Sequence, residues 1–306
     1  MLRSVLLAAA RNKRFEHLVA AAPISRDVVA RFVAGVAVDD AHRVAHELVG
    51  SGLEVSIDRL GEDTTDELSA TATRDAYVDL LSGLGAVGLT PATEVSLKLS
   101  AVGLLLDERL ALDNARAICR AAANAGTTVT LDMEDHTTTD STLALHSELR
   151  EDFPATGVAV QAYLRRTEAD CRDLGAVGAR VRLCKGAYAE PESVAYATAL
   201  DVDRSYVRCL NALLSGDGYP MLATHDPRLI AIAEERAHWY ERDVDSYEFQ
   251  MLYGIRPDEQ RRLVADGYTV RVYVPYGDQW YGYLMRRLAE RPANVAFFLR
   301  ALSGTK

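Results

Sequence analysis

Short β-rich runs and longer helical stretches alternate along most of the chain. The β-rich runs are LEVSID, VSLKLS, TVTLDME, GVAVQAY, ARVRLCKG, MLATHD, YEFQMLYG and VRVYVPYG. Each is followed by a stretch with apolar residues at helical spacing, such as DERLALDNARAICRAAANAG after the second run. Strands that alternate with helices pair in parallel, and eight such units in about 250 residues are typical of a closed (β/α)8 TIM barrel. An open doubly wound sheet is the alternative architecture.

The first 50 residues carry a different pattern. The segments RFEHLVAAA, SRDVVARFVAG and VDDAHRVAHELVG each place apolar residues at helical spacing, and Gly50 and Gly52 then interrupt the pattern. The sequence therefore predicts an N-terminal helical arm over residues 1–50 and a barrel domain over residues 51–306.

The two sides of the predicted strands differ in polarity. Successive side chains of a strand point to opposite sides, and one side is apolar in run after run, as with Val181 and Leu183 in the fifth. In a barrel this apolar side packs against the helices, so the other side lines the lumen. A purely structural lumen favours branched apolar residues, because a buried unpaired charge costs several kcal/mol. We therefore interpret the polar side as a functional site. Its residues are Lys98, Asp132, Gln161, Arg182 and Tyr273.

Charge and cysteine content narrow the classes of function. A net charge of -10 over 306 residues disfavours a surface that neutralises phosphates, so no nucleic-acid partner is expected. The four cysteines lack CxxC spacing, which indicates reduced thiols rather than a disulfide framework or a zinc site. The apolar runs are shorter than the roughly 20 residues of a membrane span, and the N-terminus lacks a small-residue cleavage site. A cytoplasmic location is expected.

Lys98 stands at the end of the second predicted strand and admits three interpretations. It could be a Schiff-base nucleophile as in barrel aldolases, a cation for a substrate carboxylate, or part of a structural ion pair. Asp132 lies near Asp135 and His136, but the two carboxylates point to different sides of an extended strand. We therefore expect no metal and interpret Asp132 as an electrostatic partner in the lumen.

Two clusters of basic residues suggest anion binding. Arg182 and Lys185 precede Gly186 at a strand end, where a glycine allows close approach to an anionic ligand or cofactor. Solvent-exposed charge is the alternative. Further along, Arg286, Arg287 and Glu290 share one helix surface, either as a solvated salt bridge or as a clamp on a small carboxylate beside the barrel mouth.

These residues, taken together, resemble a known family. The strings SLKLS, LDMED, QAYLRRTEAD, RLCKGAY, ATHDPRLI, YEFQMLYGIR, VRVYVPYG and YLMRRLAERPAN are similar, in this order, to the proline dehydrogenase family, from about residue 50 to the C-terminus. The resemblance implies a distorted (β/α)8 barrel that holds FAD noncovalently at the carboxyl ends of its strands, with L-proline against the flavin ring.

The resemblance also implies roles for single residues. Lys98, Asp132, Arg182 and Tyr273 would be catalytic, with Asp132 near the flavin. The substrate-binding residues would be Lys98, Tyr188, Leu252, Tyr273, Arg286, Arg287 and Glu290. The FAD-contacting residues would be Asp132, Gln161, Arg182, Lys185, Gly186, Tyr188, Thr224, His225 and Gln250.

The implied reaction is oxidation of L-proline to Δ1-pyrroline-5-carboxylate, with electrons passed to a quinone. Arg182 near the flavin would favour its reduced form. The chain would be monofunctional, would contact a membrane at most peripherally, and would leave its product to a separate pyrroline-5-carboxylate dehydrogenase. Two alternatives stay open: a Schiff-base aldolase or lyase that uses Lys98, and an amino-acid-binding barrel without a cofactor.

Overall fold

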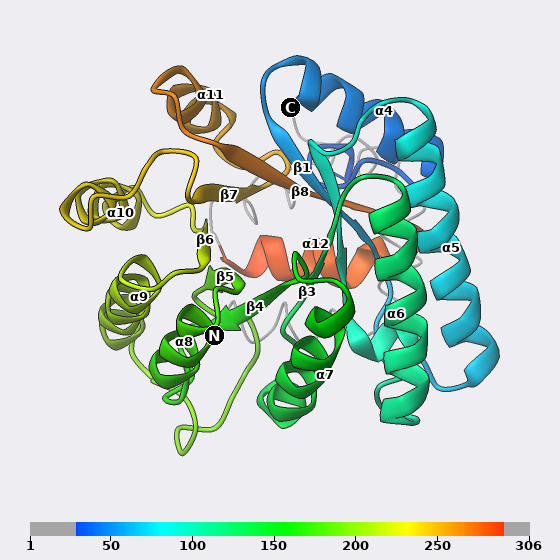
Figure 1. The fold of residues 1–306 in the computed structure, drawn as a ribbon, viewed down its shortest axis with the longest axis horizontal. Coiled ribbons are helices and arrows are strands. Elements are labelled where there is room, and N and C mark those ends of the chain that lie inside the picture. Colours follow the sequence, from blue (N-terminus) through cyan, green and yellow to red (C-terminus); the bar gives the residue numbers. More distant parts are fainter. Residues whose placement is uncertain (1–28, 291–306) are drawn as a thin grey trace, which may run out of the picture.

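A closed barrel of parallel strands forms the centre of the computed structural model, which describes residues 29–290 (Figure 1). Within that range eight strands follow one another around the barrel in chain order, and β8 pairs with β1 to close it. The strands are β1 (Glu54–Arg59), β2 (Thr93–Leu97), β3 (Val129–Leu131), β4 (Gly157–Gln161), β5 (Arg180–Cys184), β6 (Tyr219–Ala223), β7 (Glu248–Leu252) and β8 (Val270–Tyr276). The predicted barrel is confirmed, and the open sheet is wrong because none of the eight described strands has an unpaired edge.

Most of the described helices surround the barrel and connect consecutive strands, while the first precedes β1 and the last follows β8. They are α4 (Val38–Gly50), α5 (Glu67–Ala86), α6 (Glu108–Asn124), α7 (Thr139–Asp152), α8 (Thr167–Ala176), α9 (Ala199–Leu214), α10 (Pro227–Trp239), α11 (Pro257–Ala265) and α12 (Trp280–Glu290). Short 3-10 helices η1 (Leu99–Val102) and η2 (His136–Thr138) follow β2 and β3. Several helices begin after a residue whose side chain accepts an N–H of the first turn; Asp66 does so for α5 and Asp107 for α6.

The hydrophobic core lies between the strands and the helices. Val95, Leu97, Val181 and Leu183, which alternate with polar residues along β2 and β5, are fully buried in it. Each such side chain contributes about 1.5–3 kcal/mol on burial. The predicted division of apolar and polar sides is therefore confirmed, and the polar side chains are left to the lumen.

Helix α4 packs against β1 and β8, and its side chains Ala41, Val44 and Ala45 belong to the same core as the strands. The proposed boundary at residue 50 stays a prediction, and residues 1–28 of the proposed arm lie outside the described residues. Among residues 29–290, no helix is long and apolar enough to cross a membrane.

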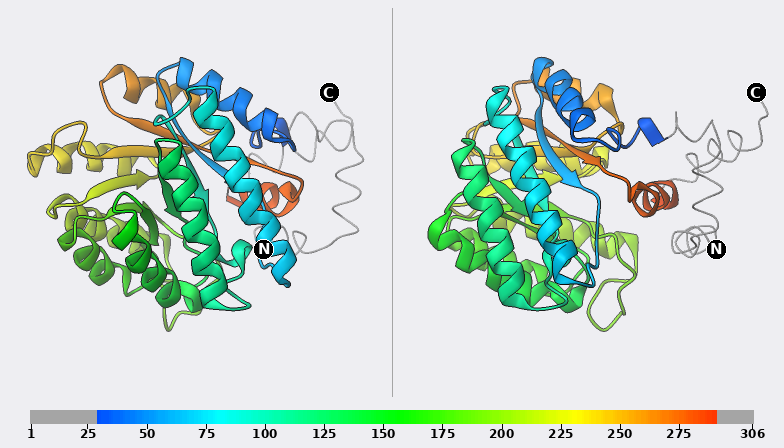
Figure 2. Two further views of the ribbon diagram at one scale, coloured as in Figure 1. Left: turned by 45° about the vertical axis from the view of Figure 1, so that its right-hand side comes forward. Right: turned by 90° about the vertical axis from the view of Figure 1, so that its right-hand side faces the viewer.

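Helix α12 lies across one end of the barrel in both figures (Figures 1 and 2). Its Tyr281, Leu284 and Met285 form a small core with Leu60, directly after β1, and Ile255, shortly after β7. This is the end at which the strands terminate. In (β/α)8 barrels that end carries the active site, so α12 covers the region in which a site is expected.

Candidate active site

Lys98 lies directly after β2 and reaches into the lumen, where two carboxylates neutralise it. Its Nζ is 2.8 Å from Oδ2 of Asp58 and 3.7 Å from Oδ2 of Asp132. Burial disfavours the ammonium charge, but the carboxylates of Asp58 and Asp132 outweigh that effect and raise the pKa of Lys98 well above its usual range. Lys98 is therefore a permanent cation at neutral pH.

Arg182, in the middle of β5, spans the lumen below Lys98. Its Nη1 donates to Oδ1 of Asp132 at 2.6 Å and to Oγ of Ser96 at 2.5 Å. Its Nε donates to Oε1 of Gln250 at 2.6 Å, and its Nη2 to Oγ of Ser56 at 3.2 Å. Burial opposes the guanidinium charge, yet the nearby carboxylates, that of Asp132 first, raise the pKa of Arg182. The result is a buried cation fixed by side chains from four other strands or strand ends.

Tyr273 on β8 completes this group. Its hydroxyl donates to Oδ2 of Asp132 at 2.7 Å, and its ring centroid is 5.5 Å from Cζ of Arg182. Burial, followed by the carboxylate of Asp132, raises the pKa of Tyr273 well above its usual range, so the hydroxyl remains a donor. The lumen residues predicted from strand alternation, Lys98, Asp132, Arg182 and Tyr273, therefore lie together.

Gln161 at the end of β4 has one amide atom engaged and one that is not. Its Nε2 donates to the carbonyls of Met133 and Glu134 at 3.1 and 3.0 Å. Its buried Oε1 has no partner in the described part of the chain. A buried acceptor without a partner is costly, unless a ligand N–H reaches it. The pyrimidine part of a flavin ring offers such an N–H.

The basic segment after β5 is explained partly by local packing. Nζ of Lys185 lies 2.6 Å from Oδ1 of Asp203 and 3.1 Å from Oδ2 of Asp226, so a phosphate would have to compete with two carboxylates. Gly186 has a φ of +113°, and a Cβ there would lie 2.3 Å from the ring of Tyr163. The ring of Tyr163 therefore requires a glycine here, whether or not a cofactor approaches it.

The ends of β6 and β7 are joined by a histidine. Nε2 of His225 accepts the backbone N–H of Leu252 at 2.9 Å, which leaves the second ring nitrogen to carry the proton. Gln250 is buried beneath Arg182, and its Nε2 donates to Oε1 of Glu248 at 2.5 Å. Both amide atoms of Gln250 are thus engaged within the protein, and it would influence a cofactor through Arg182. Thr224 is buried beside this group.

The substrate-binding residues predicted on α12 are only partly described. The Cζ atom of Arg287 is 5.3 Å from the ring centroid of Tyr283 on the helix that crosses the mouth. The side chains of Arg286 and Glu290 lie outside the described residues. Tyr188, in the segment between β5 and α9, is half-buried.

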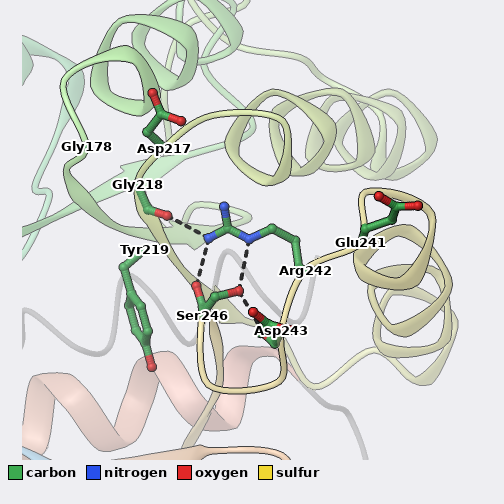
Figure 3. A pocket seen from close by; sticks show the side chains of 8 residues that line it. All are labelled: Gly178, Asp217, Gly218, Tyr219, Glu241, Arg242, Asp243 and Ser246. Carbon is green, nitrogen blue, oxygen red and sulfur yellow. Dashed lines mark hydrogen bonds between the residues drawn. The ribbon is translucent and has the colours of Figure 1, made fainter.

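Two further features do not add to this site. Among the described residues, no group of three or more His, Cys, Asp and Glu side chains could hold a metal ion. A hollow of about 470 Å³ lies at the opposite end of the barrel, where Gly178, Gly218 and Tyr219 precede or begin β5 and β6. Its central side chain, Arg242, is hydrogen bonded to the Gly218 carbonyl and to Ser246 (Figure 3).

Comparison with known proteins accounts for this lumen. A family model described as proline dehydrogenase matches residues 41–300. The chain belongs to the proline dehydrogenase family. One relative, Proline dehydrogenase 1 of Bacillus subtilis, is 38% identical over 302 residues, which are 99% of each chain. Another, Proline dehydrogenase of Deinococcus radiodurans, is 40% identical over 277 residues, or 89% of each chain. As a member of this family, the protein is an oxidoreductase.

Solved structures support the same fold. Proline utilization A of Bdellovibrio bacteriovorus, inactivated by N-propargylglycine, superposes with a TM-score of 0.81 at 24% identity. Proline utilization A of Bradyrhizobium japonicum superposes with a TM-score of 0.74 at 22% identity. The chain spans 38% of the first of these longer proteins and 32% of the second, while 93% and 91% of its own length is covered.

The sequence analysis did not predict three carboxylates below and beside the site, those of Asp58, Glu94 and Glu248. Asp58 pairs with Lys98, and it lies on the polar side of β1 next to Ser56, so the same alternation could have identified it. Deeper in the lumen, Glu94 binds Arg180 at 3.0 Å, and Glu248 binds Arg271 at 2.8 Å. These deeper ion pairs form a charged floor beneath Arg182.

Arg271 and Arg180 keep Glu94 ionised. Burial raises the pKa of Glu94, but Arg271 and Arg180 outweigh burial and lower it to about 2. Because one oxygen of Glu94 also lies 3.4 Å from Nη2 of Arg182, the floor supports the guanidinium from below.

Proposed function

We propose that the chain is an FAD-dependent proline dehydrogenase that oxidises L-proline to Δ1-pyrroline-5-carboxylate, the first step of proline catabolism. The observation that carries the proposal is the buried group of Lys98, Asp132, Arg182 and Tyr273, which come from four strands or the residues directly after them. The curated relatives named proline dehydrogenase, which match nearly the whole chain, supply the substrate class.

The donor set around the mouth suits an isoalloxazine ring. Oε1 of Gln161 is a buried acceptor without a partner in the described residues, and Arg182 supplies a fixed positive charge nearby. Bound FAD would accept the hydrogen and the electron pair of the substrate C–H bond. A fixed cation close to the ring favours the reduced, electron-rich form, because the guanidinium needs no reorientation when charge arrives.

Lys98 would bind the substrate carboxylate. Lys98 remains charged, and a substrate carboxylate bound to it would lie close to Tyr273. Asp132 would keep its other partners when that carboxylate binds. Arg286 and Arg287 would hold the same carboxylate from α12, with Glu290 orienting them. Leu252 and Tyr273 would line the pocket, and Tyr188 would close it.

The charge on Lys98 disfavours the Schiff-base alternative. A lysine nucleophile attacks as the neutral amine, and such lysines have a lowered pKa. The pKa of Lys98 is shifted in the opposite direction by Asp58 and Asp132. An amino-acid-binding barrel without a cofactor would not need the arginine at position 182 or the free acceptor of Gln161.

Lys185, Gly186, Thr224 and His225 belong to the proposed FAD-contacting segments. A quinone would reoxidise the cofactor, and a separate pyrroline-5-carboxylate dehydrogenase would oxidise the product further. The expected location is the cytoplasm, with at most peripheral membrane contact.

Product analysis tests the proposal. The purified protein, supplied with FAD, is incubated with L-proline and a soluble quinone, and the product is identified by mass spectrometry. A cyclic imine two hydrogen atoms lighter than proline is expected in large excess over the flavin only when both proline and the quinone are present. Failure to form it, together with covalent trapping of Lys98 by borohydride and a carbonyl compound, would favour the lyase instead.

A further inference from the structure

One buried carboxylate joins the segment after β5 to two neighbouring loops. Glu190 accepts the backbone N–H of His136 at 3.0 Å and the hydroxyl of Tyr163 at 3.1 Å, and its second oxygen is paired with Nδ1 of His136. The side chain of Glu190 is only 4% exposed, although it lies in a connecting segment. A carboxylate this buried requires several partners, and here all of them come from other loops of the barrel mouth.

Tyr163 extends this contact toward β5. Its backbone N–H donates to the carbonyl of Lys185 at 2.8 Å, and its own carbonyl accepts the N–H of Tyr196 at 2.8 Å. Its ring lies against Gly186, where a Cβ would come within 2.3 Å. The segment between β5 and α9 is therefore held on Tyr163 near both of its ends.

Tyr188 lies between these two points of attachment. Its backbone lies beside the hydroxyl of Tyr163 and lowers the pKa of that phenol. Burial and the carboxylate of Glu190 act in the other direction and prevail, so the pKa of Tyr163 is raised and its hydroxyl remains a donor to Glu190. The pairing of Tyr163 with Glu190 thus lies next to the backbone of Tyr188.

We propose that Glu190 is a positioning residue that fixes residues 185–190 and, through them, the closure of Tyr188 over the substrate. The proposal rests on the proposed function, because the role of Tyr188 in closing the site belongs to it. Glu190 does not reach the lumen group itself: its described partners are His136 and Tyr163. Its effect should therefore appear in substrate binding rather than in the chemical step.

Steady-state kinetics of Glu190→Ala and Glu190→Gln provide the first readout. Loss of a hydrogen-bonded buried carboxylate should raise the KM for L-proline on the order of tenfold and change kcat much less. The isosteric Glu190→Gln serves in case the alanine variant fails to fold. Glu192→Gln is the matched control, since Glu192 lies two positions away on the same segment and is exposed.

Limited digestion with trypsin provides a readout that does not depend on activity. Cleavage after Lys185 should be about tenfold faster in both Glu190 variants than in the wild type and in Glu192→Gln, because cleavage requires the segment to leave its attachment. Tyr163→Phe keeps the ring against Gly186 and removes only the hydroxyl. It should change KM and cleavage in the same direction by a smaller factor.

The two readouts separate this inference from the proposed function. A wild type that does not oxidise proline contradicts the proposed function, and trypsin then still decides whether Glu190 holds the segment. A wild type that does oxidise proline, combined with Glu190 variants whose KM and cleavage rate equal those of the control, overturns the positioning role. A fall in kcat with an unchanged KM and an unchanged rate of cleavage also overturns the positioning role.

Discussion

Arg182 and Asp132 form the central ion pair of the barrel, with Nη1 of the arginine 2.6 Å from Oδ1 of the aspartate. The other carboxylate oxygen accepts the hydroxyl of Tyr273 at 2.7 Å and lies 3.7 Å from Nζ of Lys98. One carboxylate therefore fixes the relative positions of groups from β2, β5 and β8. Cations and donors arranged in this way cost no reorganisation when charge develops beside them.

Replacing Arg182 by lysine should lower kcat/KM for proline on the order of a hundredfold. Lysine keeps a charge but cannot reach Asp132, Ser96 and Gln250 at once, as the guanidinium does. Steady-state kinetics of the FAD-loaded variant measure the loss, and circular dichroism checks the fold. Arg172→Lys, at an exposed position on α8, is the control and should match the wild type.

Tyr273→Phe removes one hydrogen bond to Asp132 and keeps the ring over Arg182. We expect kcat/KM to fall on the order of tenfold, because the aspartate keeps its contacts with Arg182 and Ser96. A loss as large as that of Arg182→Lys would show that the hydroxyl does more than orient Asp132. The comparison uses the same kinetic assay.

Much of this site could be predicted from the sequence, because it depends on a local rule. Strand alternation places Lys98, Asp132, Arg182 and Tyr273 on the lumen side whatever their neighbours are. Alternation does not say which cation meets which carboxylate, since that depends on strand register around the closed barrel. The pairing of Lys98 with Asp58 could not be predicted for this reason.

Contacts between loops were also beyond sequence reasoning. Glu190 and His136 are 54 positions apart and meet only because the loops after β3 and β5 converge at the mouth. Gly186 was noticed for its freedom near a ligand, but the structure adds a packing reason, the ring of Tyr163. The end of the second strand was predicted too late as well: β2 ends at Leu97, and Ser100 lies in η1, where its hydroxyl donates to Glu134.

Lys98→Met should destabilise the fold by about 3–5 kcal/mol, because it leaves the fully buried carboxylate of Asp58 without its cation. Combining it with Asp58→Asn should restore most of that loss. Urea unfolding of the two single variants and the double variant measures the coupling. A double variant whose loss equals the sum of the single losses would show that the pair is not coupled.

His146 should make the stability of the protein depend on pH in a defined window. The ring is buried, with Nε2 donating to the carbonyl of Thr156 at 3.1 Å, and burial lowers its pKa from 6.5 to about 4. The unfolded chain then binds the proton that the folded protein excludes. The contribution of neutral His146 to the free energy of unfolding is complete above pH 6.5 and is lost as the pH falls toward 4. At about 1.4 kcal/mol per pKa unit, the total loss is about 3 kcal/mol.

His146→Gln is the variant that isolates this effect, because it keeps an N–H donor and does not titrate. The free energy of unfolding of the wild type, measured in urea between pH 7 and 4, should fall more steeply than that of the variant. The carboxylate of Glu94, with its pKa lowered to about 2, should add a loss of stability at lower pH, below 4.5, in both proteins. Parallel curves above pH 4.5 would contradict the assignment to His146.

Anaerobic titration of the purified, FAD-supplied protein with L-proline, followed by visible absorption, tests the central claim most directly. The account predicts that the protein shows the absorption bands of oxidised flavin, that proline bleaches them, and that a soluble quinone restores them. A protein that stays colourless after FAD is supplied, or whose flavin bands do not change with proline, would contradict it.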